Sequence, residues 1–161
     1  MLSLAAPLLG RLGRGQLARR GATRRARRGG RPAPHALPAG LDVEGFLAAA
    51  REHFVQLQSA WDAGDGPRLA QLATGPLLAD LRAQIDVRDG RVDRTEVVAL
   101  HARLLAFEPV GDALVASVEF SGLVRERPGA GAERFRELWL LARLGADSSP
   151  QWRLAQAQAL A

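Results

Sequence analysis

The spacing of apolar residues changes once along this chain, and that change limits the folds open to it. Between residues 42 and 63, apolar side chains recur at every third or fourth position, which is typical of an amphipathic helix. After residue 94 the period falls to two, which is typical of a half-buried strand. Helices followed by strands predict an α+β fold, with the helices packed on one face of an antiparallel sheet.

Three helices are expected before the change of period. The first runs from Asp42, its predicted N-cap, to about Ala63. Its apolar stripe consists of Phe46, Ala50, Phe54, Leu57 and Trp61. The Gly-Asp-Gly-Pro segment at 64–67 ends this helix and starts a short second one, which runs to about Ala73. A third helix begins after Thr74, its predicted cap, and ends at Asp89 and Gly90.

About four strands follow. We expect 94–108 to be a strand, although its composition also fits a helix, and the turn at 109–112 joins it to a second strand at 113–125. In that second strand one alternating set of side chains is apolar and the other is mostly polar. Residues 133–144 and 151–159 supply the last two strands. The sequence therefore predicts a meander of antiparallel strands.

The positive charge lies almost entirely at one end of the chain. Residues 1–40 hold nine arginines and no acid, whereas residues 41–161 hold thirteen arginines and seventeen acids. The first part thus carries +9 and the second −4. We predict a disordered, arginine-rich arm over residues 1–41 and one folded domain over residues 42–161. A folded nucleic-acid binder normally carries its cations on the domain, so nucleic acid is a disfavoured partner.

The composition of the arm fits several roles. A solvated tail is the simplest, and mitochondrial targeting or a nucleic-acid tether also suits arginine-rich, acid-free sequence. An anionic membrane surface would attract each arginine by about 1 kcal/mol. The predicted membrane contacts are Arg19, Arg20, Arg24, Arg25, Arg27 and Arg28. The uncharged stretch before Arg11 is too short to span a bilayer as a helix.

Composition also excludes several chemistries. There is no cysteine, which removes disulfides, thiolate catalysis and cysteine-ligated metal centres. The three histidines, His35, His53 and His101, lack the spacing of a metal site. We therefore expect neither a metal ion nor another cofactor.

Five short motifs follow one another through the folded part. They are Phe46–Asp65, Arg94–Leu100, Val118–Gly122, Phe135–Trp139 and Trp152–Ala155. In this order they resemble the Tim44-like domain, which occurs in bacterial proteins and in the mitochondrial import-motor tether. The resemblance covers about residues 42–158. The final strand departs from the family pattern, because it reads Gln-Ala-Gln-Ala at 156–159.

The resemblance implies a nuclear-transport-factor-2-like cone, in which helices close a curved sheet around an apolar pocket. It also implies a non-catalytic, membrane-associated module that holds a lipid or a hydrophobic protein segment and takes part in protein translocation or membrane-protein assembly. Bacterial relatives usually carry a hydrophobic N-terminal segment where this chain has its arm. We therefore expect a location at the bacterial inner membrane, peripheral or anchored by a segment missing from this chain, with the cytoplasm as the alternative.

The predicted pocket residues are inward-facing side chains that would serve equally well in an ordinary core. They are Phe54, Trp61, Phe120, Glu137 and Trp139. Strand alternation puts Glu137 on one face with Phe135 and Trp139. A carboxyl group between two aromatic residues is expected either to pair with an arginine, such as Arg143 or Arg125, or to have a raised pKa.

An enzyme is the main alternative, because isomerases and dehydratases share the cone. They need a general base inside the cavity, and the candidates are His53, His101, Asp65 and Glu137. Asp65 is better explained as the cap of the second helix, and the histidines as ordinary structural residues. No tyrosine is present to stabilise an oxyanion. We therefore predict no catalytic residues, with an enzyme or an arm-mediated nucleic-acid binder as the alternatives.

Overall fold

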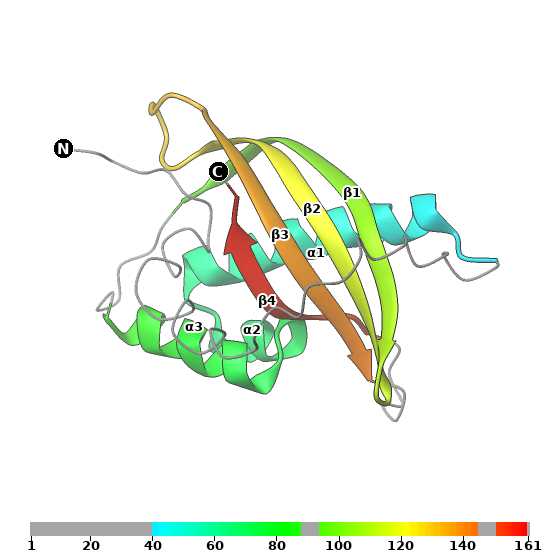
Figure 1. The fold of residues 1–161 in the computed structure, drawn as a ribbon. Coiled ribbons are helices and arrows are strands. Elements are labelled where there is room, and N and C mark those ends of the chain that lie inside the picture. Colours follow the sequence, from blue (N-terminus) through cyan, green and yellow to red (C-terminus); the bar gives the residue numbers. More distant parts are fainter. Residues whose placement is uncertain (1–39, 88–93, 145–150, 161) are drawn as a thin grey trace, which may run out of the picture.

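Three helices precede four strands in the computed structural model, which describes residues 40–87, 94–144 and 151–160 (Figure 1). The helices are α1 (Val43–Ala63), α2 (Gly66–Leu72) and α3 (Gly75–Val87). The strands are β1 (Glu96–Val110), β2 (Ala113–Arg125), β3 (Glu133–Leu144) and β4 (Arg153–Ala159). This order confirms the α+β, nuclear-transport-factor-2-like architecture. The predicted arm lies outside the described residues, apart from its last two positions.

The helix ends form where local sequence predicts them. The Asp42 carboxylate accepts a hydrogen bond from the Gly45 N–H (2.9 Å) and so caps α1. Gly64 ends that helix in the left-handed region, with φ of 67°, which glycine adopts without steric cost. Asp65 caps α2 by accepting from the Arg68 N–H (3.1 Å).

The four strands form one antiparallel sheet in the order β1-β2-β3-β4. Two register shifts interrupt the β1–β2 pairing and leave Val98 and Leu105 without a partner on β2. Such bulges bend a strand and increase its twist. Gly122 lies beside the first bulge, where an added Cβ atom would collide with the Ala99 carbonyl. The bulges and this glycine together account for the curvature of the sheet.

The first hairpin turn is shorter than the sequence predicts. β1 continues through Pro109 and Val110, which pair with Leu114 and Ala113, so only residues 111–112 form the turn. Proline is tolerated in this strand because β1 is an edge of the sheet, where a missing N–H need not break the ladder.

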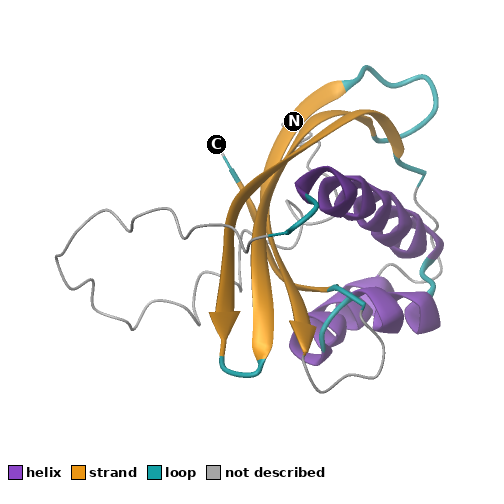
Figure 2. Cartoon of the chain, turned by 90° about the vertical axis from the view of Figure 1, so that its right-hand side faces the viewer, coloured by secondary structure: helices purple, strands orange, loops and turns teal. Residues whose placement is uncertain are grey.

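The helices cover the concave side of the sheet (Figure 2). Phe54 of α1 lies in the centre of the core, with its ring 4.8 to 5.5 Å from the rings of Phe120, Phe135 and Trp139. The predicted inner face of β2 is buried at Ala116, Val118, Phe120 and Val124. The predicted stripe of α1 is also buried, except at Phe46, which is only partly covered.

The end of α1 is tied to the start of β1 through a buried carboxylate. Asp62 accepts hydrogen bonds from the Thr95 N–H (2.6 Å), the Thr95 hydroxyl (3.2 Å) and the Gln58 side chain (2.9 Å). These bonds satisfy a carboxylate that is only 8% exposed. They link the last turn of α1 to the residue just before β1.

Candidate functional site

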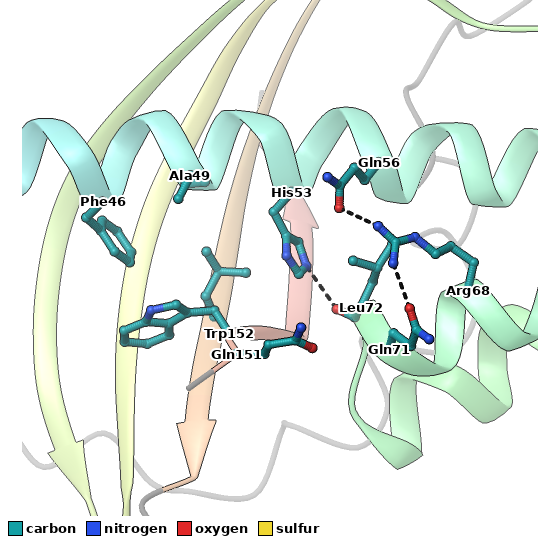
Figure 3. Close-up of a pocket in the computed structure, with 11 residues that line it drawn as sticks. Phe46, Ala49, His53, Gln56, Arg68, Gln71, Leu72, Gln151 and Trp152 are labelled. Atoms are coloured by element: carbon teal, nitrogen blue, oxygen red, sulfur yellow. Dashed lines mark hydrogen bonds between the residues drawn. The ribbon is translucent and has the colours of Figure 1, made fainter. Parts of the chain in front are cut away.

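A cavity of about 240 Å³ lies between α1, α2 and the start of β4 (Figure 3). Its apolar wall is formed by Phe46, Ala49, Ala50, Leu72, Leu141 and Trp152. Its polar rim is formed by His53, Gln56, Arg68, Gln71 and Gln151. The cavity therefore presents an apolar surface and several hydrogen-bonding groups to the same ligand.

One backbone contact places α2 beside β4 and so shapes the cavity. The Thr74 N–H, just beyond α2, donates to the Leu154 carbonyl at 2.9 Å, and Ala73 forms a parallel bridge with Leu154. This contact occupies part of the free edge of β4.

Aromatic packing fixes the apolar end of the cavity. The Trp152 ring lies edge-on to the rings of Phe46 and Phe107, with centroids 5.3 and 5.7 Å apart. The Arg143 guanidinium lies 5.6 Å from the centre of the same indole ring. Trp152 is thus held by three side chains while one part of it remains at the cavity wall.

Two glutamines fix the guanidinium at the polar end. Arg68 Nη2 donates to Gln56 Oε1 at 2.8 Å, and Arg68 Nη1 donates to Gln71 Oε1 at 2.6 Å. Gln71 lies three residues after Arg68 on α2, whereas Gln56 comes from α1. Both partners are neutral amides, so these two hydrogen bonds position the guanidinium without supplying a negative charge.

His53 forms the middle of the rim and is neutral at neutral pH. Burial is the largest cause that lowers the pKa of His53, and the nearby charge of Arg68 lowers it further. The hydrogen bond to the Leu72 carbonyl acts in the opposite direction. Since that carbonyl accepts at 2.9 Å from Nε2, the proton is assigned to Nε2 and Nδ1 is left as an acceptor.

The five residues predicted to line a pocket lie together in the core, and other residues form the wall of this cavity. Phe54, Trp61, Phe120, Glu137 and Trp139 are each at most 4% exposed. This arrangement matches the ordinary-core reading of the same side chains, and their role in binding a ligand stays a prediction.

Glu137 has no arginine partner among the residues that the structure describes. Arg125 instead pairs with Glu96, and Arg143 stacks on an indole ring, so the expected ion pair with either arginine is wrong. The Trp139 Nε1–H donates to Glu137 Oε2 at 2.8 Å, and Oε1 has no hydrogen-bond partner. Burial raises the pKa of Glu137 to about 7, although the tryptophan bond opposes this change. The alternative expectation, a raised pKa, is the one that fits.

The other candidate bases are not brought together. His101 is exposed on the outer face of β1, and Asp65 caps α2. Sequence reasoning missed Gln56, Arg68 and Gln71 altogether, because only the packing of α2 against α1 joins them. The spacing of Arg68 and Gln71 was the one available signal, since residues three apart on a helix are neighbours.

The residues predicted to contact a membrane are not among those that the structure describes. Arg19, Arg20, Arg24, Arg25, Arg27 and Arg28 lie outside the described residues. Within the described helices, none is long and apolar enough to cross a membrane.

Comparison with known proteins gives one family match. The model of the Tim44-like domain matches residues 33–159. No curated protein matches the sequence. Among solved structures, the chain is similar to the intermembrane space region of the chloroplast protein ARC6 (11% identity, 71% of this chain, 96% of that chain, TM-score 0.45). It is also similar to a conserved protein from Planctomyces limnophilus (15% identity, 73% of this chain, 99% of that chain, TM-score 0.41). A third similar structure is described as Rd1NTF2_04 with long sheet (12% identity, 68% of this chain, 98% of that chain, TM-score 0.31).

Proposed function

This chain belongs to the Tim44-like family of membrane-associated domains, and we propose that it is a non-catalytic module that holds one apolar chain in the cavity between α1, α2 and β4. The apolar chain belongs to a lipid or to a hydrophobic protein segment. The observation that carries the proposal is the cavity itself, where Trp152 and Phe46 form an apolar wall beside a polar rim. A part in protein translocation or membrane-protein assembly is proposed on the family resemblance alone.

The size of the cavity limits what it holds. Ligand pockets for drug-sized molecules occupy roughly 300 to 1,000 Å³. A cavity of about 240 Å³ lies just below this range and suits a single narrow chain. This geometry supports a module that holds one alkyl chain or one short apolar segment.

The position of the titratable groups supports binding without reaction. General acid–base catalysis needs a titratable side chain within hydrogen-bond reach of the ligand. On the cavity rim that group is His53, whose Nε2 is bonded to a backbone carbonyl, so only Nδ1 could accept a proton, and whose lowered pKa makes it a weak base. Glu137, whose pKa of about 7 would suit such chemistry, is enclosed in the core. An isomerase- or dehydratase-like reaction would require Glu137 to reach the ligand.

Tryptophan fluorescence tests occupation of the cavity. Trp152 is at the cavity wall, whereas Trp61 and Trp139 are buried in the core. Vesicles whose phospholipids carry bromine on one acyl chain should quench the full chain, and Trp152→Phe should remove most of that quenching. Trp61→Phe is the matched control and should retain it. Unchanged quenching in Trp152→Phe would mean that the apolar chain does not enter this cavity.

Flotation with anionic vesicles tests the membrane part of the proposal. We expect the full chain to float, and a chain lacking residues 1–40 to float less, because the nine arginines of that segment are attracted to anionic lipid. If neither protein floats, membrane association is wrong.

A further inference from the structure

We infer that the ligand of this cavity is a single apolar chain ending in an oxyanion, either a carboxylate or a phosphate, and that Arg68 binds the oxyanion. The inference depends on the proposed function and makes it more specific, because it names the class of ligand and the residue that binds the negative charge of the ligand. The apolar end of the ligand would lie against Phe46 and Trp152.

The first step of the argument is the state of Arg68. An arginine side chain has five N–H donors, and the two glutamine bonds use one on each terminal nitrogen. Three donors of a rigidly held, planar guanidinium therefore remain. A carboxylate or phosphate is the acceptor that matches such a fork, because it can take two parallel hydrogen bonds.

The second step is a comparison with other arginines of the described segments. Arg103 and Arg136 each lie 3.2 Å from the Glu119 carboxylate, and Arg125 lies 2.7 Å from the Glu96 carboxylate. These three positive charges are compensated within the protein. Among the residues that the structure describes, Arg68 has only amide oxygens as partners, so its charge is available to a ligand.

The third step is how the amide of Gln56 is oriented. Gln56 Nε2 donates to the Glu52 carboxylate at 3.1 Å, which directs the amide oxygen of Gln56 toward Arg68. The hydrogen bond of Glu52 therefore goes to the amide that contacts the guanidinium. Gln56 and Gln71 thus hold Arg68 in place, and the Glu52 carboxylate bonds to the far end of the Gln56 amide.

The fourth step is the layout of the cavity along α1. Phe46 and Gln56 are ten residues apart on this helix, which corresponds to about 15 Å. In Figure 3, Phe46 and Trp152 lie toward one end, Arg68 lies toward the other, and His53 lies between them. One extended alkyl chain with an anionic end group matches this separation of apolar and charged ends.

Titration calorimetry of the full chain at pH 8 tests the inference. The probes are decanoate, the uncharged decanol and inorganic phosphate, each below its micelle-forming or solubility limit. We expect decanoate to bind about tenfold to a hundredfold more tightly than decanol, as for a hydrogen bond to a charged group. Arg68→Gln should abolish this preference, because it should weaken decanoate binding about tenfold or more and so bring it to the level of decanol binding. Arg134→Gln, on the outer face of β3, is the charge-matched control and should keep it.

Arg68→Lys keeps the inference testable if Arg68→Gln does not fold. Lysine keeps the charge and loses the fork, so decanoate affinity should lie between those of the wild type and the glutamine variant. Thermal unfolding, followed by circular dichroism, confirms that each variant is folded before it is titrated.

The outcomes separate the inference from the function on which it depends. If neither decanoate nor decanol binds, the proposed apolar cavity fails and the inference fails with it. If both bind equally, or if Arg68→Gln binds decanoate as tightly as the wild type, the cavity stands and the oxyanion assignment is overturned. Displacement of decanoate by equimolar phosphate would show a site for an anion alone. Arg68-dependent binding to phosphatidylglycerol vesicles without decanoate binding would place the oxyanion in a bilayer and overturn the single-chain ligand.

Discussion

Replacing Glu137 with glutamine should remove a penalty that the folded protein carries at alkaline pH. Glu137 is 1% exposed, and its Oε1 has no hydrogen-bond partner in the described part of the chain. Burial therefore favours the neutral acid, and the pKa of Glu137 rises from 4.5 in its ordinary environment to about 7 in the folded state. Glutamine has a similar shape, accepts the same Trp139 hydrogen bond and carries no charge at any pH.

The size and sign of the effect follow from the two pKa values of Glu137. Below pH 4.5 the carboxyl group of Glu137 is protonated in both the folded and the unfolded state. Its ionisation then costs the folded state no stability, so the favourable contribution of the neutral acid to the free energy of unfolding is fully present. As the pH rises through 7, the folded state must also release the proton and this contribution is lost. The difference between 4.5 and about 7 corresponds to about 3 kcal/mol in the free energy of unfolding.

Urea unfolding of both proteins at pH values from 4 to 9 measures this difference. The half-buried His53 works in the opposite direction, since its lowered pKa makes the fold more stable as the pH rises toward 6.5. Subtracting the wild-type curve from the Glu137→Gln curve cancels His53 and all other unchanged groups. We expect the variant to gain about 3 kcal/mol relative to the wild type between pH 4 and pH 9. A difference that does not change with pH would refute the buried, unpaired state of Glu137.

Three further substitutions test the fold that holds the cavity, each by chemical unfolding. Gly122→Ala should lose about 1 to 3 kcal/mol, because its Cβ atom meets the Ala99 carbonyl at the first bulge; full stability would show that the bulge relaxes. Asp62→Ala should lose about 1 to 3 kcal/mol, since the Thr95 N–H would be left without its acceptor; a neutral result would mean that water replaces the carboxylate. Phe54→Ala should lose about 3 to 5 kcal/mol by opening a void among three rings; a loss below about 1 kcal/mol would contradict its central position.

The parts of the fold that depend on local sequence could be predicted from it. The caps at Asp42 and Asp65 need only the backbone N–H groups three residues later, so their sequence context is sufficient. The buried face of β2 follows from strict alternation, because successive side chains of a strand point to opposite faces.

The parts of the fold and of the site that depend on packing between distant segments could not be predicted from the sequence. Alternation places Glu137 on the inner face, but it does not say which cross-strand neighbours meet it, and the expected arginine partners turned out to have other contacts. The cavity is a clearer case. Gln56 and Arg68 lie on different helices, and their contact forms only after the turn between α1 and α2 brings the helices together.

Nuclear magnetic resonance of the full chain with decanoate tests the central claim most directly, namely that an apolar chain occupies the cavity between α1, α2 and β4. The account predicts intermolecular Overhauser effects from the decanoate methylene protons to the ring protons of Phe46 and Trp152, with the largest amide shift changes around His53 and Arg68. Overhauser effects confined to the outer face of the sheet, at residues such as His101 and Arg134, would contradict it.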